Sequence, residues 1–146
     1  MLRLLVLVAG VALLGAACSG AKPPTFGLLD GRLRDCPDSP NCVSSQTSKK
    51  SHAVRPYDTG GDPQAAWQRL RAALADYPRC KIVEENGRYM RAEFRSAVFR
   101  FVDVGEFFPD EKAGVIHVRS ASMTGYSDLG VNRKRVEKIR ALLEKP

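Results

Sequence analysis

The sequence predicts an α+β domain in which two helices pack on one face of an antiparallel four-stranded meander. Three observations predict it. Apolar residues recur at helical spacing around residue 70 and again around residue 139, and strand-like segments lie between them. Asn86-Gly87 is the strongest short-range signal for a β-hairpin. Strands grouped between two helices indicate an α+β layer, here preceded by an irregular arm that carries a candidate disulfide.

The first 17 residues have the layout of a secretory signal peptide. Arg3 precedes an apolar run from Leu4 to Leu14, and small residues follow as far as Cys18. The run is too short for a comfortable membrane span, which needs about 20 apolar residues. Residues 14–18 (LGAAC) resemble a bacterial lipobox, whose cysteine carries acyl chains such as palmitate, although glycine stands where leucine is usual. The alternative is a plain signal peptide that is cut nearby.

Lipidation of Cys18 predicts an exported protein that is anchored to a bacterial membrane and faces the periplasm, with the outer membrane favoured. Buried acyl chains contribute about 0.8 kcal/mol per CH2, so several chains on one cysteine anchor firmly. Residues 18–31 are rich in Gly, Pro and small side chains, as a lipidated tether should be. Residues 32–146 then form a single domain, long enough to bury its own core.

The chain is basic, with a formal charge of +7. A basic surface suits an anionic lipid, a glycan or an envelope protein as partner. Nucleic acid is not expected as a partner, because the predicted location is the cell envelope. No cofactor or metal is expected, since the chain has no phosphate-binding Gly-rich loop, no G-x-S-x-G or H-E-x-x-H motif and no zinc spacing.

Beyond Cys18 the chain has three cysteines, Cys36, Cys42 and Cys80. They allow three pairings, and each pairing leaves one thiol over. Cys36 with Cys42 is favoured in an oxidising compartment, because two prolines bend the short chain between them. A metal site would recruit His52, but no second ligand pair exists. A redox role is disfavoured because C-x5-C lacks the tight C-x-x-C geometry.

Residues 32–61 are rich in turn-forming residues and show no helical periodicity, which favours extended chain. A helix then begins at Asp62-Pro63, where the aspartate can cap the free N–H groups and proline fits the first turn. Tyr77-Pro78 stops it, because the residue before a proline avoids helical geometry. The stripe at helical spacing predicts core packing, with Trp67 as an anchor rather than part of a ligand cage. Its members are Trp67, Leu70 and Leu74.

Four strands are predicted next, and a glycine in the third, Gly105, suggests a bulge. In the second strand, apolar and charged residues alternate, which is typical of a sheet with one solvated side. Both turn positions of Asn86-Gly87 are expected to have positive φ. Phe99 and Phe101 are expected to share one face of the third strand. The strands span residues 81–85, 88–95, 98–108 and 115–122.

The last strand ends in a polar cluster. Its apolar residues share a face with Ser120 and Ser122, so the two serines should reach the edge of the core. His117 and Arg119 should look outward from the opposite face, which weakens a catalytic role for His117. The candidate ligand-binding residues are Arg119, Ser120, Ser122, Tyr126, Asp128, Asn132 and Arg135.

The final helix is amphipathic, and Asn132 falls in its apolar stripe, where it must find hydrogen-bond partners. A start at Asn132 would crowd basic residues at the positive end of the helix, which favours a bound anion or carboxylate. A start at Ser127 or Asp128 would cap the helix and need no ligand. Local signals favour this second start, because Asp128 is a good cap and Leu129 would join the stripe. The cluster is then either a hydrogen-bonded joint or the floor of a site, and the joint is favoured.

Acid–base chemistry would depend on carboxylates. Asp103 and Glu106 are three positions apart on a strand, so they should point to opposite faces unless Gly105 breaks the alternation. We therefore hypothesise a non-enzymatic envelope lipoprotein domain that binds a partner or an anionic component, or that serves as a structural element of an envelope complex. The alternative is a hydrolase or transferase acting on an envelope lipid or glycan, with Asp103, Glu106 or Asp128 as acid or base.

Three motifs resemble the bacterial and plastid family catalogued as domain of unknown function 1499: CPDSPNCVSSQ at 36–46, RFVD followed by Glu106-Phe107, and RSASMTGYSDLGVNRKRVEKIR at 119–140. The resemblance spans residues 33–143. It implies that Cys36 and Cys42 belong together and implies no activity. The chain departs from the family in having Val104 after Asp103, where paired aspartates are frequent. It also has Met123-Thr124 where an arginine is common.

Overall fold

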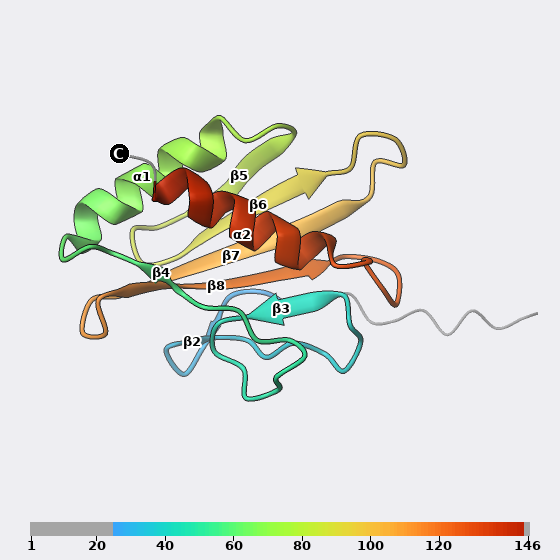
Figure 1. Cartoon of the computed structure of the whole chain (residues 1–146), viewed down its shortest axis with the longest axis horizontal. Helices are drawn as coiled ribbons and strands as arrows, with labels where there is room; N and C mark the ends of the chain where they lie inside the picture. Colours follow the sequence, from blue (N-terminus) through green and yellow to red (C-terminus); the bar gives the residue numbers. More distant parts are fainter. Residues whose placement is uncertain (1–24, 145–146) are drawn as a thin grey trace, which may run out of the picture.

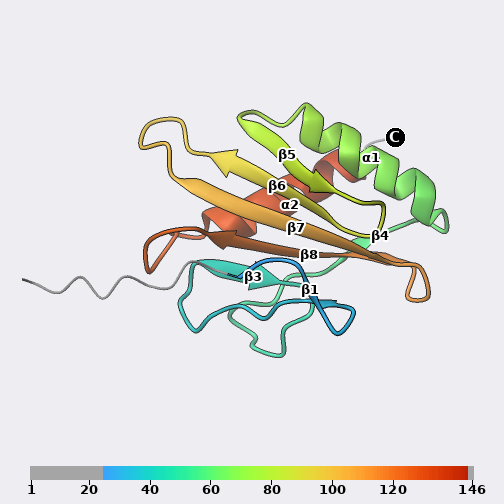
Figure 2. The same cartoon turned by 180° about the vertical axis from the view of Figure 1, so that it is seen from behind.

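The computed structural model describes residues 25–144, and the predicted signal peptide and Cys18 lie outside this range. Two helices cover one face of an antiparallel sheet (Figure 1), and the N-terminal arm, residues 26–58, packs against the sheet's edge and opposite face (Figure 2). The elements are β1 (Leu28–Leu29), β2 (Arg32–Leu33), β3 (Cys42–Ser44), β4 (Tyr57–Asp58), α1 (Pro63–Ala75), β5 (Cys80–Glu85), β6 (Met90–Arg95), β7 (Val102–Asp110), β8 (Val115–Ser122) and α2 (Val131–Leu143).

The predicted α+β class and the meander from β5 to β8 are confirmed. The main sheet has six strands rather than four, because the N-terminal arm adds two short strands along the free edge of β8. β3 pairs with the end of β8, with Cys42 opposite Ala121, and β4 pairs with its beginning, with Tyr57 opposite Ile116. β8 is therefore an interior strand.

The hydrophobic core lies between the sheet and the two helices. Asp62 caps α1 as predicted, since its carboxylate accepts the N–H of Ala65 at 2.8 Å, and Pro63 is the first helical residue. The predicted stripe of α1 is buried, Trp67 included, so this tryptophan is a core residue. Strand alternation turns every second side chain toward the helices. The core includes Trp67, Leu70, Leu74, Met90, Ala92, Phe94, Phe107, Ile116, Val118, Val136 and Ile139.

The Cys36–Cys42 disulfide is present, with Cα atoms 5.6 Å apart. Both cysteines are buried and pack with Ala121 in a small second cluster. Among residues 25–144, Cys80 is in no disulfide, and burial raises the pKa of its thiol to about 11.

Replacing Cys36 and Cys42 with serine is expected to lower the free energy of unfolding by about 2 kcal/mol, because the closed loop is short. Urea unfolding with and without reductant checks this. The wild type should lose the same amount on reduction, and the double variant should not respond. Cys80→Ser is the matched control and should keep the response to reductant. A wild type whose unfolding is indifferent to reductant would contradict the prediction.

The predicted strand 98–108 is shifted. β7 begins only at Val102, and residues 96–101 form an exposed loop in which Phe99 is 75% exposed. The predicted bulge at Gly105 is also wrong, since this residue pairs in regular register with Ala92 and Ser120. A Cβ atom at position 105 would lie 2.9 Å from the ring of Phe94. The glycine therefore makes room for a core ring.

The hairpin at residues 86–87 is confirmed, but its turn differs from the prediction. Of the two residues only Gly87 has a positive φ, 78°. Glu85 pairs with Met90, so the loop has four residues. The side chain of Asn86 accepts the N–H of Arg88 at 3.3 Å, which lets asparagine shape the turn without a left-handed backbone. The register shift of this hairpin lies in β5, between Ile82 and Glu84.

Candidate functional site

Helix α2 begins at Val131, between the two starts considered above. Leu129 and Gly130 have φ of 53° and 79°, so neither can belong to the helix, and Leu129 is 86% exposed. The favoured start at Asp128, with Leu129 in the stripe, is therefore wrong. Asp128 still serves the helix end, because its carboxylate accepts the N–H groups of Gly130 at 2.9 Å and Asn132 at 2.7 Å. The negative charge expected at this positive end is thus supplied by the chain itself.

Asn132 is fully buried and uses its whole side-chain amide. Its oxygen accepts from the hydroxyl of Ser120 at 2.6 Å and from Arg135 at 2.5 Å. Its nitrogen donates to the hydroxyl of Ser122 and to the carbonyl of Asn41, both at 3.0 Å. These four bonds satisfy a buried asparagine and join α2, β8 and the disulfide loop.

Arg135 completes the same network from the next turn of α2. Its guanidinium donates to Asp103 of β7 at 2.5 Å and to Ser120 at 3.1 Å, and it stacks over the ring of Phe94, 4.6 Å from the centroid. Both side chains of the ion pair are nearly buried. We refer to Ser120, Ser122, Asn132, Arg135 and Asp103 as the helix joint.

Asn41 extends the helix joint into the disulfide loop. Its side chain donates to the carbonyl of Gly125 at 2.5 Å, and its own carbonyl accepts the N–H of Ser122 at 3.0 Å. The first and last sequence motifs therefore meet in space. Sequence reasoning missed Asn41 as a partner, although its place between two linked cysteines marked that loop as fixed.

Arg119 lies on the opposite face of β8, as alternation requires, but it does not look outward. It is 1% exposed and donates to Glu106 of β7 at 2.5 Å. The other oxygen of Glu106 accepts from the hydroxyl of Tyr89 and the N–H of Gly27, both at 2.7 Å. The outward orientation was wrong because the N-terminal arm covers this face, through residues that had been assigned to the tether. Burial, followed by the charge of Glu106, holds the pKa of Tyr89 well above its usual value.

The candidate residues thus fall into three places. Ser120, Ser122, Asn132 and Arg135 belong to the helix joint, and Asp128 caps the helix beside it. Arg119 belongs to the ion pair on the other face, and Tyr126 stands 74% exposed on the loop after β8. The three carboxylates considered as acid or base, Asp103, Glu106 and Asp128, are each bound to a different partner and do not form a pair.

His117 is half-buried beside β3. The hydroxyl of Ser45 accepts the N–H of Val118 at 2.9 Å and lies 3.1 Å from Nδ1 of His117, so its proton is free to be donated to that nitrogen. Nε2 of His117 lies 3.7 Å from a carboxylate oxygen of Asp110. Burial lowers the pKa of His117 below its ordinary value of 6.5, and Asp110 partly offsets this.

The neutral imidazole of His117 is therefore expected to stabilise the fold above about pH 6.5, and this contribution should fall as the pH drops through the lowered pKa. NMR titration of the imidazole should give a midpoint below 6.5. Asp110→Asn should lower that midpoint further, because the carboxylate favours the charged ring. A midpoint at or above 6.5 in the wild type would contradict the assignment.

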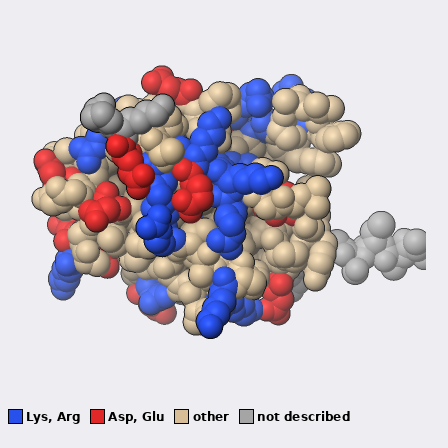
Figure 3. Space-filling view, in the orientation of Figure 1, with Lys and Arg blue, Asp and Glu red and all other residues tan. Residues whose placement is uncertain are grey.

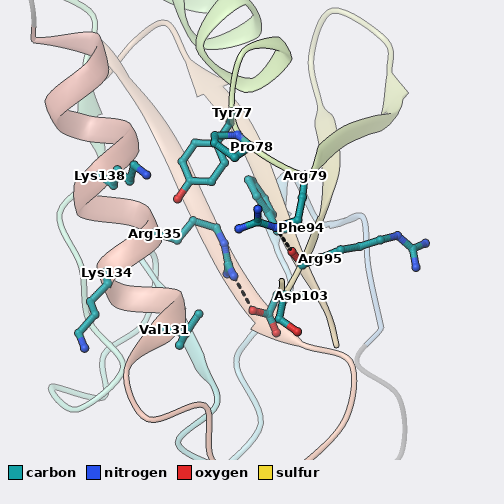
Figure 4. Close-up of a pocket in the computed structure, with 11 residues that line it drawn as sticks. Tyr77, Pro78, Arg79, Phe94, Arg95, Asp103, Val131, Lys134, Arg135 and Lys138 are labelled. Atoms are coloured by element: carbon teal, nitrogen blue, oxygen red, sulfur yellow. Dashed lines mark hydrogen bonds and ion pairs between the residues drawn. The ribbon is translucent and has the colours of Figure 1, made fainter. Parts of the chain in front are cut away.

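A groove runs past the helix joint and consists of two adjoining pockets. The basic pocket, of about 270 Å³, lies between α2 and the ends of β5 and β6 (Figure 4). The loop pocket, of about 430 Å³, lies between the loop at 96–101 and the loop after β8. Ser96, Asp103 and Val131 line both pockets. Three residues of the helix joint, Asp103, Ser122 and Arg135, therefore line the groove in addition to their structural contacts.

The basic pocket carries an excess of positive charge. Figure 4 shows Arg135 reaching from α2 to Asp103, with Arg79 and Lys138 close to the same space. Lys138 lies over the ring of Tyr77, 5.0 Å from the centroid, and Arg79 donates to the carbonyl of Arg95. Lys and Arg side chains also gather on the face that carries α2 (Figure 3). The basic side chains that line the pocket are Arg79, Arg95, Lys134, Arg135 and Lys138.

Within residues 25–144, no three His, Cys, Asp or Glu side chains come together in a way that could hold a metal ion. The helices of the same range are too short or too polar to span a membrane.

Comparison with known proteins gives one family. A family model described as a protein of unknown function (DUF1499) matches residues 32–143. No curated protein and no solved structure matches the chain.

Proposed function

The chain belongs to the DUF1499 family of proteins of unknown function, and we propose that it is an envelope lipoprotein whose domain binds an anionic group without catalysis. The group we assign is a phosphate-bearing component of the envelope, held in the basic pocket. The lipid anchor at Cys18 and the periplasmic location are part of this proposal and are supported by the N-terminal sequence pattern.

The observation that carries the proposal is the charge of the basic pocket. Five basic side chains line it, and its one carboxylate, Asp103, is already paired with Arg135. Among the described residues, Arg79, Lys134 and Lys138 have no carboxylate partner within 4.0 Å. Arg79 and Lys138 lie close to the pocket, whereas the side chains of Lys134 and Arg95 point away from it (Figure 4). Unpaired cations beside a concave space attract an anion and can hold it by charge-assisted hydrogen bonds.

The positions of the carboxylates support binding rather than catalysis. Glu106 is fully buried in its ion pair and faces away from the groove. Asp128 is occupied by two backbone N–H groups, and Asp103 is held by Arg135. A general acid or base needs a carboxyl group that can reach a substrate and exchange a proton, and each of these is held by other bonds.

The test is binding of a soluble phosphate probe, dihexanoyl phosphatidylglycerol below its micelle concentration, to the purified lipoprotein by titration calorimetry. Arg79→Gln with Lys138→Gln should weaken binding by at least about tenfold, because two charge-assisted bonds are lost. Arg69→Gln with Lys112→Gln, two exposed cations outside the basic pocket, is the matched control with the same change in net charge. The control should bind like the wild type.

Absence of binding by the wild type would overturn the proposal. Equal weakening in both double variants would also overturn it, because the effect would then come from net charge alone. Zwitterionic dihexanoyl phosphatidylcholine should bind more weakly than the anionic lipid, and equal binding of the two would show that the pocket does not select a charge.

A further inference from the structure

Large apolar side chains stand exposed at one end of the sheet, on two neighbouring loops. The loop between β6 and β7 and the loop between β8 and α2 lie at the same end (Figure 1), since Asp103 pairs with Ser122 and the N–H of Met123 donates to the carbonyl of Val102. We refer to these two loops as the apolar tip. Its exposed apolar residues are Val98, Phe99, Phe101, Tyr126 and Leu129, each 59–86% exposed, and Val131, the first residue of α2, lies beside it and is 46% exposed.

These exposed side chains do not contribute to the hydrophobic core of the domain. The rings of Phe99 and Phe101 stack on each other, 5.7 Å apart, without entering the core. Leu129 has a left-handed φ of 53°, is 86% exposed and is not part of the core. A cluster of aromatic and aliphatic side chains on projecting loops marks an interaction surface.

Basic side chains lie on the β5–β6 side of the apolar tip. Arg100 is part of it, and Arg79, Lys81 and Arg95 line a small pocket together with Arg100 and Ser96 at the same end. The acidic groups nearby are occupied, since Glu93 pairs with Arg95 and Asp128 caps α2. Aromatic and aliphatic residues flanked by arginine and lysine match the interface of an anionic bilayer, where apolar groups enter and cations meet the headgroups.

The length of chain before the domain limits where this surface can be. If Cys18 is lipidated, the seven residues from 18 to 24 span at most about 25 Å when fully extended. The domain must then stay within about 25 Å of the bilayer to which Cys18 is anchored.

We propose that the apolar tip inserts into the surface of an anionic lipid bilayer. Insertion brings the groove, which begins at Ser96 of the tip and at Val131 beside it, to the level of the lipid headgroups. This inference rests on the envelope location in the proposed function. Anion binding in the basic pocket does not depend on the surface that it assigns.

The experiment is sedimentation with vesicles, made either of phosphatidylglycerol and phosphatidylcholine or of phosphatidylcholine alone. The protein is the chain from residue 18 with Cys18→Ser, which retains every helix and strand, the disulfide and the core described here. It should bind the anionic vesicles, more weakly at high salt. Phe99→Ser with Leu129→Ser should weaken this binding by at least about tenfold. Both residues are exposed, so the fold should survive, and unchanged urea unfolding checks this.

Leu28→Ser with Leu29→Ser is the matched control. These two leucines of β1 are also exposed, at 36% and 53%, but lie on the N-terminal arm away from the tip. The control should bind vesicles like the parent protein. Equal binding by the tip variant and the parent would overturn the inference and would leave an envelope protein as the partner of this surface. Equal loss in tip variant and control would overturn it too.

The soluble probe separates this inference from the proposed function. The tip variant should bind dihexanoyl phosphatidylglycerol as the parent does, because Arg79 and Lys138 are intact. Loss of vesicle binding with retained probe binding supports the tip. If the Arg79→Gln, Lys138→Gln variant loses probe binding but keeps vesicle binding, the apolar tip binds bilayers without the help of the basic pocket.

Discussion

Replacing Arg119 with methionine is expected to lower the free energy of unfolding by about 3–5 kcal/mol, because it leaves the carboxylate of Glu106 buried without its cation. Both side chains are almost completely inaccessible, at 1% and 0%. The remaining partners, Tyr89 and Gly27, are neutral donors and cannot replace the lost charge. Urea denaturation, followed by circular dichroism at pH 7, measures the change.

The double variant Arg119→Met, Glu106→Gln is the decisive comparison. Removing both charges from a buried site is often close to neutral, so the double variant should recover at least half of the loss. Glutamine still offers an oxygen to Tyr89 and Gly27. A single variant that costs less than about 1 kcal/mol would show that water reaches Glu106, and the description of this pair as buried would then be wrong.

Asn132→Ala is expected to cost about 3 kcal/mol, because it leaves several buried polar groups without partners at once. The hydroxyls of Ser120 and Ser122 and the carbonyl of Asn41 all lose a bond to it. The variant should lose global stability, and two loops should also open more often. Hydrogen exchange of the disulfide loop and of the loop after β8 should accelerate, since Asn132 joins both to α2.

Lys134→Ala, two positions along the same helix, is the control for Asn132→Ala. The side chain of Lys134 is exposed and makes no hydrogen bond or ion pair within residues 25–144, so its removal should change stability by less than about 0.5 kcal/mol. If the two alanine variants lose the same stability, the cost arises from the helix itself and the joint contributes little.

The parts of the fold that sequence reasoning predicted depend on local signals. Asp62-Pro63 and the turn at Gly87 act within a few residues, and alternation in β6 and β8 tells which side chains share a face. The disulfide was predictable because its two cysteines are close in sequence. These signals fixed the helix–strands–helix order before any distant contact was known.

The errors involve contacts between distant segments. β3 and β4 have three and two residues, too few to show a period, and they exist as strands because β8 pairs with them. The orientation of Arg119 was misjudged because nothing local shows that residues near Gly27 return to cover it. The prediction for Leu129 failed for a different reason. Gly130 adopts a left-handed backbone directly before α2, so Leu129 lies outside the helix although it is hydrophobic.

The two buried ion pairs also restrict the register of β7 relative to its neighbours. Asp103 and Glu106 sit on the same strand but point to opposite faces, and each meets an arginine fixed elsewhere, on α2 and on β8. A one-residue slip of β7 would move both carboxylates to the wrong faces together and bury two negative charges without counterions. Once the N-terminal arm has covered the second face, the register of β7 is therefore specified by charge as well as by hydrophobicity.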